Sequence, residues 1–152
     1  MTNEDRKPDG HSALDLDRQI CHSLYSASNA LVRAYRPLLE SLDLTYPQYV
    51  VMMSLWQRDA VSISELVRHT RLDAGTLTPL LRRLQDKELI ASEVAASDGR
   101  SRIITLTRKG RTLKKSAEKV PGQIACSVDL PMEDALQLKT LCEQLISRLS
   151  GD

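Results

Sequence analysis

The sequence of 152 residues predicts a mainly α-helical fold of the α+β class, in which one β-hairpin interrupts a series of helices. Three observations lead to this prediction. Apolar residues recur at helical spacing near both ends of the chain. Over residues 90–106 the period changes to that of two strands around a polar turn. Positive charge is concentrated between these regions, since residues 61–120 contain 13 Lys and Arg against 7 Asp and Glu.

The flanking segments are acidic on balance, with 6 Lys and Arg against 8 Asp and Glu in residues 1–60, and 2 against 5 in residues 121–152. A basic middle segment is expected of a protein that binds phosphates, and it also fits a solvated basic surface. No apolar run approaches the roughly 20 residues that span a bilayer. Residues 1–13 are polar and predict a flexible tail, not a secretory signal. We therefore expect a cytoplasmic protein with no membrane partner.

The first helix is expected over residues 14–42, with Pro37 bending or interrupting it near its end. Thr45 is a suitable N-cap for a second helix over residues 46–56, which tolerates Pro47 in its first turn. The apolar positions of the first helix are Leu14, Ile20, Leu24, Ala27, Leu31, Val32, Leu38, Leu39 and Leu42.

The middle segment predicts a helix-turn-helix followed by a hairpin. Residues 62–65 fit a capping box that opens a short helix ending near His69. Asp73 can cap the next helix, whose leucines form one apolar stripe. Strands are expected over residues 90–95 and 102–106. Together these elements predict a winged helix-turn-helix.

Thr107 is expected to cap a long basic helix over residues 108–126, and a last amphipathic helix follows over residues 132–149. The terminal helices are apolar on one face, and pairing them with those of a second copy would bury these faces. Aromatic residues are scarce, with one Trp, four Tyr and no Phe. We expect one domain, residues 14–149, in a homodimer. Its parts are a DNA-binding lobe of residues 61–107 and dimerisation helices in residues 14–60 and 108–149.

In a helix-turn-helix, the N-terminal part of the second helix enters the major groove of DNA. The candidates for contact there are Gly75, Thr76, Thr78, Pro79, Arg82 and Arg83. In the wing, Arg100 and Arg102 suit a minor groove. Asp98 is expected to hold an arginine side chain and so fix the shape of the wing. The alternative is that these are ordinary surface residues and weak surface ion pairs.

The three cysteines, Cys21, Cys126 and Cys142, have no metal-binding spacing and do not suggest a disulfide framework. We expect no metal or cofactor. A free cysteine is either an apolar packing residue, which we expect of Cys142, or a thiolate that peroxides oxidise to sulfenic acid.

Residues 73–84 and 98–110 resemble the recognition helix and the wing of the MarR family of repressors. The resemblance extends over nearly all of residues 14–149. It implies a dimer, a palindromic operator in double-stranded DNA, and repression relieved by a signal. Within that family, the sequence is similar to the organic hydroperoxide sensors called OhrR over residues 19–28, 35–39 and 44–49.

The resemblance to OhrR implies roles for individual residues. Cys21 is implied to be the peroxide-reactive thiol, with Tyr35 and Tyr46 as its hydrogen-bonding partners. Cys126 is implied to be the resolving cysteine, which forms a disulfide with Cys21 of the partner subunit. His22 departs from the apolar aromatic residue that is usual in this subgroup, so the resemblance does not imply a fully apolar peroxide pocket.

The favoured hypothesis is therefore a redox-responsive repressor that senses organic hydroperoxides through Cys21 and then releases its operator. The alternative is a repressor released by a small aromatic or phenolic ligand, bound between the lobes near Tyr25, Tyr35 and Tyr46 without cysteine chemistry. A third hypothesis is a thiol peroxidase, but the sequence shows no thioredoxin-like βαβ pattern to support it. We therefore expect no enzyme.

Overall fold

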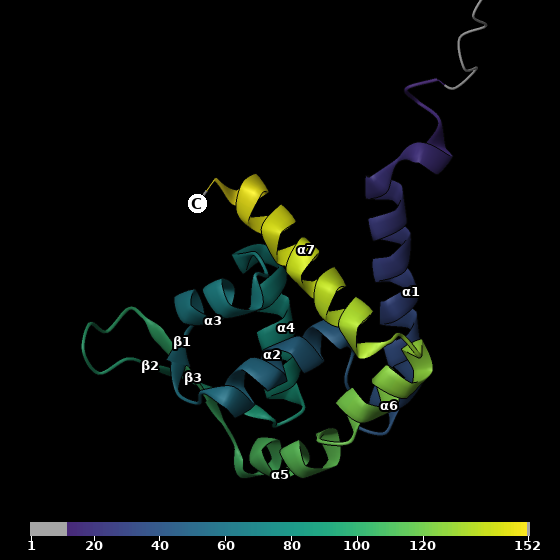
Figure 1. The fold of residues 1–152 in the computed structure, drawn as a ribbon. Helices are drawn as coiled ribbons and strands as arrows, with labels where there is room; N and C mark the ends of the chain where they lie inside the picture. Colours follow the sequence, from purple (N-terminus) through teal and green to yellow (C-terminus); the bar gives the residue numbers. More distant parts are fainter. Residues whose placement is uncertain (1–11, 152) are drawn as a thin grey trace, which may run out of the picture.

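The computed structural model describes residues 12–151, and it is mainly helical with one small antiparallel sheet (Figure 1). This architecture confirms the predicted fold class. The predicted tail, residues 1–13, lies outside the described residues except for Ser12 and Ala13. In chain order the elements are a 3-10 turn (Leu16–Arg18), α1 (Ile20–Glu40), α2 (Tyr46–Gln57), β1 (Val61–Ser62), α3 (Ile63–Thr70), α4 (Ala74–Asp86), β2 (Ile90–Val94), β3 (Arg102–Leu106), α5 (Arg108–Ala117), α6 (Val120–Val128) and α7 (Met132–Ser150).

The helix starts follow the predicted caps. Thr45, Ser62, Asp73 and Thr107 each accept a hydrogen bond from the backbone N–H three residues further on. Such a bond satisfies one of the N–H groups that the first turn of a helix leaves unpaired. The starts of α2, α3, α4 and α5 are therefore set by local sequence.

The residues 61–107, here called the winged lobe, contain a strand that the sequence analysis missed. β1 pairs with β3, so the sheet order is β1-β3-β2, with Val61 opposite Ile104 and Ile90 opposite Leu106. β1 has two residues, too few to show an alternating period. It ties the start of α3 to the hairpin.

Two predicted helices have different bounds. α1 begins at Ile20 rather than Leu14, and it continues past Pro37 to Glu40 without interruption. The single helix predicted over residues 108–126 is divided into α5 and α6. Pro121 explains the break, because it has no N–H to donate to the carbonyl four residues earlier, that of Ala117.

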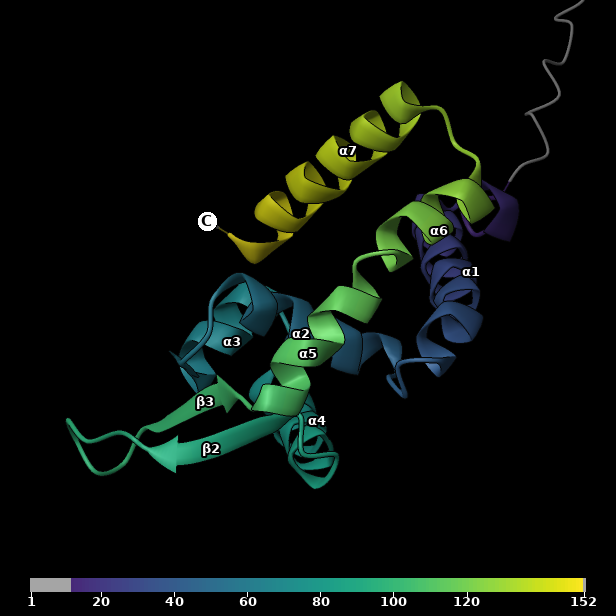
Figure 2. The same ribbon diagram turned by 90° about the horizontal axis from the view of Figure 1, so that it is seen from below.

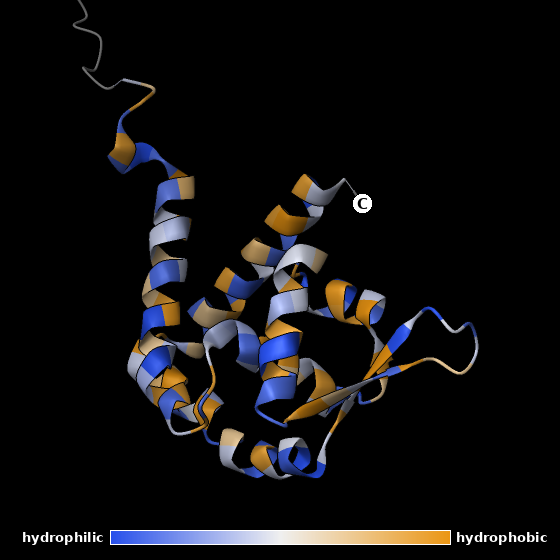
Figure 3. Cartoon of the chain, turned by 180° about the vertical axis from the view of Figure 1, so that it is seen from behind, coloured by the Kyte–Doolittle hydropathy of each residue, from blue (hydrophilic) through white to orange (hydrophobic). Residues whose placement is uncertain are grey.

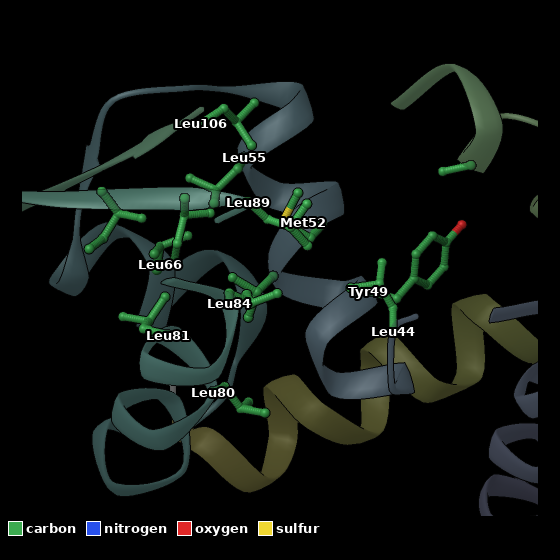
Figure 4. Close-up of a cluster of buried hydrophobic side chains, with 14 of the residues drawn as sticks. Leu44, Tyr49, Met52, Leu55, Leu66, Leu80, Leu81, Leu84, Leu89 and Leu106 are labelled. Carbon is green, nitrogen blue, oxygen red and sulfur yellow. The ribbon is translucent and has the colours of Figure 1, made fainter. Parts of the chain in front are cut away.

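The core fills the winged lobe and extends to α2. Met52, Leu66 and Leu84 are fully buried, and Figure 4 shows side chains of α2, α3 and α4 pointing toward one another. α2 was predicted to belong to the dimerisation helices, residues 14–60. It contacts α3 and α4 as well as α1, so it packs both on the winged lobe and on a predicted dimerisation helix.

The outer helices leave apolar side chains exposed. α7 has no buried residue, and α1 has only Leu39. Figures 2 and 3 show α1 and α7 extending beside the winged lobe, with apolar residues recurring along both. Ile20 and Leu149 are each 79% exposed. Within residues 12–151, no helix combines the length and hydropathy needed to cross a membrane.

Candidate nucleic-acid interface and thiol site

The predicted DNA-contact residues of the helix-turn-helix lie on the outer face of α4. Leu77, Leu80, Leu81 and Leu84 form the predicted apolar stripe and are buried, which fixes the rotation of the helix. All six predicted DNA-contact residues of α4 are exposed: Gly75, Thr76, Thr78, Pro79, Arg82 and Arg83. The structure thus brings them together on one helix face.

The two threonine hydroxyls are already used within the helix. Thr76 Oγ1 donates to Asp73 Oδ2 at 2.8 Å, and Thr78 Oγ1 donates to the carbonyl of Ala74 at 2.8 Å. The bond from the Thr76 hydroxyl is the main reason that the pKa of Asp73 is lowered. What the threonines offer to DNA is therefore their methyl groups and an acceptor lone pair, not the hydroxyl proton.

The arginines of α4 differ from the threonines. Within residues 12–151, neither Arg82 nor Arg83 has an ion-pair partner. A guanidinium that carries five N–H donors and no carboxylate partner is suited to bind phosphate or the O6 and N7 atoms of guanine. Gly75 lies beside them, where an added Cβ would approach Asp73 Oδ1 to 3.2 Å.

The wing is shaped by Asp98, but not through an arginine side chain as predicted. Asp98 Oδ1 accepts from the backbone N–H of Arg100 at 2.9 Å and of Ser101 at 2.8 Å, and Oδ2 accepts from Ser101 Oγ at 2.6 Å. The Ser101 hydroxyl, followed by these backbone N–H groups, lowers the pKa of Asp98 to about 2. The side chain of aspartate is short, so its carboxylate accepts hydrogen bonds from N–H groups of its own turn more readily than from the guanidinium of a more distant arginine.

The two wing arginines occupy different positions. Arg102 lies at the start of β3, where Nε donates to Ser92 Oγ across the hairpin at 2.8 Å. Arg100 lies in the loop at the tip and is exposed. Arg102 is exposed as well, and contact with DNA stays a prediction for both side chains.

The predicted thiol site is not assembled within one chain. Cys21 is the second residue of α1 and is exposed. Tyr35 lies 14 residues further along the same helix, which separates the two backbones by about 21 Å along the axis. Cys126 is exposed on α6 and Cys142 is half-buried on α7; all three cysteines are free. A second chain is required if Cys21 is to meet these tyrosines.

Tyr35 and Tyr46 are in contact, with ring centroids 4.8 Å apart. Tyr49, which the sequence analysis did not select, joins them at 5.9 Å from Tyr35 and 6.5 Å from Tyr46. Its position one helical turn after Tyr46 was the available signal. Tyr25 is 70% exposed and has no ring contact with this tyrosine cluster.

Burial raises the pKa of Tyr35 to about 12, with smaller contributions from Tyr46 and Tyr49. Burial also raises the pKa of Tyr46 and of Tyr49. All three phenols therefore remain protonated at neutral pH. A neutral phenol can donate its O–H to an anion such as a thiolate.

A helix-turn-helix with an exposed recognition face, followed by an arginine-bearing hairpin, defines a winged helix-turn-helix transcription regulator. The chain belongs to the MarR family, whose family model matches residues 44–101. It is 36% identical over 136 residues to the organic hydroperoxide resistance transcriptional regulator of Bacillus subtilis (strain 168), covering 90% of this chain and 92% of that protein.

Solved structures with the same fold include AbfR, a Staphylococcus epidermidis protein, in two states. The structure of reduced AbfR bound to DNA has a TM-score of 0.73 and 32% identity, and the match covers 88% of this chain and 93% of that chain. The structure of disulfide-formed AbfR has a TM-score of 0.63 and 30% identity, covering 86% and 92%. The expectation of a transcription regulator rather than an enzyme is thereby confirmed.

Proposed function

We propose that this protein is a homodimeric repressor that releases a palindromic operator when an organic hydroperoxide oxidises Cys21. The observation that carries the proposal is the placement of Cys21. It is exposed on a helix whose apolar side chains are largely exposed, and it lies about 21 Å along the helix axis from Tyr35, a protonated phenol suited to stabilise its thiolate. A dimer would bring these parts together. The similarity to a hydroperoxide-resistance regulator supports the same signal.

The dimer would bury the apolar side chains of the outer helices. Those more than 50% exposed on α1 and α7 include Ile20, Met132, Leu136, Leu138, Leu141 and Leu149. Exposed apolar surface of this extent is unusual on a monomer. If α1 of each chain packs across the other, Cys21 would approach the tyrosine cluster of the partner subunit, Tyr35 and Tyr46 included.

The chemistry proposed for Cys21 is a two-step oxidation. The thiolate sulfur attacks the terminal oxygen of the hydroperoxide, the O–O bond breaks, and the alcohol leaves after taking up a proton; the product is a sulfenic acid. The Cys126 thiol of the other chain then attacks that sulfur, a disulfide forms and water leaves. A reduced thiol donor returns both sulfurs to thiols.

On DNA, each α4 would enter a major groove and each wing, through Arg100, an adjacent minor groove. The two α4 helices of the dimer must lie about 34 Å apart to match successive major grooves on one side of the duplex. Joining Cys21 to Cys126 across the dimer would shift the outer helices, and with them this spacing. The oxidised dimer would then lose affinity.

Arg82→Ala is expected to weaken operator binding by about 10- to 100-fold, because a guanidinium on the outer face of α4 contributes about 1–3 kcal/mol when it reads a base. Fluorescence anisotropy on a labelled operator gives the affinity. The matched control is Arg148→Ala, which removes an arginine near the end of α7. If both variants lost affinity for the operator to the same small extent, Arg82 would not be a DNA-contact residue.

The proposed signal is tested by a gel-shift titration of the wild-type protein. Reduced protein is expected to shift a palindromic fragment, cumene hydroperoxide to abolish the shift, and dithiothreitol to restore it. Release by a small phenolic ligand that is unaffected by reductant would instead favour the ligand-controlled repressor. A purified protein that is a stable monomer without affinity for DNA at low salt would contradict both.

A further inference from the structure

A bidentate ion pair connects α7 to the helix-turn-helix. Arg71 Nη1 lies 3.2 Å from Glu143 Oε1, and Arg71 Nη2 lies 2.7 Å from Glu143 Oε2. The two residues are 72 positions apart in sequence. Figures 1 and 2 show α7 running back from the end of α6 toward α3. We call this pair the Arg71–Glu143 clasp.

Arg71 occupies the turn that leads into the recognition helix. It is the C-cap of α3, with a left-handed backbone (φ 59°) and its N–H bonded to the carbonyl of Val67 at 2.9 Å. The N-cap of α4, Asp73, follows two residues later. A non-glycine residue in the left-handed region is uncommon, and such a conformation persists where the surroundings hold it. The clasp therefore attaches α7 to the short turn that leads into α4.

Glu143 belongs to a helix that packs loosely on its own chain. No residue of α7 is buried. Lys139 Nζ, one turn earlier on α7, lies 3.9 Å from Glu143 Oε1 and adds a second positive charge. The Arg71 side-chain hydrogen bond is the main cause of the lowered pKa of Glu143, so the carboxylate stays ionised at neutral pH. No fully buried apolar side chain holds α7 against the winged lobe, and the clasp is a polar connection between the two.

We propose that Glu143 is a positioning residue for DNA recognition, which holds the turn before α4 in a fixed place relative to the dimerising helix α7 through Arg71. This inference rests on the proposed function, in which the dimer sets the spacing of the two recognition helices. When the ion pair is formed, the two recognition helices are ordered before DNA binds. When it is broken, operator binding has to order them, and this entropic cost lowers the affinity.

The test is a double-mutant cycle on the full-length reduced protein, with Glu143→Gln, Arg71→Gln and the double variant, measured by anisotropy on a labelled operator. Because exposed ion pairs are weak, Glu143→Gln is expected to lower affinity by about two- to fivefold in the wild-type background. It should have no effect in the Arg71→Gln background. This second comparison separates the clasp from any phosphate contact of Arg71 itself.

The matched control is Glu133→Gln, which removes a charge from the first turn of the same helix and should leave affinity unchanged. Thermal unfolding distinguishes positioning from folding, since the melting temperature should move little in every variant. Additive effects in the cycle, or tighter binding by Glu143→Gln, would overturn the inference while leaving the proposed function intact. Failure of the wild-type protein to bind the operator would instead refute the proposed function.

Discussion

Replacing Cys21 with serine is expected to give a protein that binds its operator with wild-type affinity and no longer releases it on treatment with an organic hydroperoxide. Serine has nearly the same shape, so the exposed position on α1 should accommodate it. Its hydroxyl does not ionise near neutral pH and does not form a sulfenic acid. The readout is a gel-shift titration with cumene hydroperoxide, compared with the wild-type protein at the same concentration.

The other two cysteines provide matched controls for this result. Cys142→Ser should keep the full response, because Cys142 has no part in the proposed chemistry. Cys126→Ser should lose the intermolecular crosslink on a non-reducing gel. Release of the operator by Cys21→Ser would exclude the sensor assignment, and a crosslink that persists without Cys126 would exclude Cys126 as the resolving thiol.

Gly110→Ala is expected to destabilise the fold strongly. Gly110 lies in the first turn of α5, and a Cβ built on it would lie 2.1 Å from the backbone carbonyl oxygen of Leu89. A backbone atom cannot move aside as a flexible side chain would. The Gly110 carbonyl also accepts the Trp56 Nε1–H at 2.9 Å, so a shift of α5 would break that bond. The expected loss is about 2–3 kcal/mol or more.

Thermal unfolding at fixed protein concentration should show a melting temperature lower by roughly 5–10 °C for Gly110→Ala. The matched control is Gly122→Ala on α6, where an added Cβ has no atom within 4 Å. Alanine in a helix interior is better than glycine by about 0.5–1 kcal/mol, so this variant should be as stable as the wild type or slightly more stable. Equal melting temperatures in the two variants would show that α5 tolerates the clash.

Features set by neighbouring residues were predictable from the sequence. The cap at Asp73 depends on an N–H three residues away, and the stripe from Leu77 to Leu84 depends only on helical period. Both were predicted correctly. The break before α6 was also local, since Pro121 marks it, but the prediction of one helix over residues 108–126 did not take that proline into account.

Features set by distant residues were not predictable in the same way. α2 contacts α3 and α4, and its Met52 is part of the buried core; periodicity within α2 does not reveal these contacts. The partners of Asp98 were predicted by charge, although competing backbone N–H groups were closer along the chain. The distance from Cys21 to Tyr35 follows from the length of α1. The resemblance to OhrR pointed to Cys21 and Tyr35, but it did not indicate that the two side chains are far apart within one chain.

The single tryptophan has a position with an optical consequence. Trp56 ends α2 with its indole N–H on the Gly110 carbonyl of α5, and its ring centroid is 6.4 Å from that of Tyr49. The indole thus lies at the contact between α2, which packs on the winged lobe, and α5, which leads to α6 and α7. Its fluorescence therefore reports on the contact between α2 and α5 without an added label. Stopped-flow fluorimetry on the unmodified protein can measure the rate of any movement at this contact.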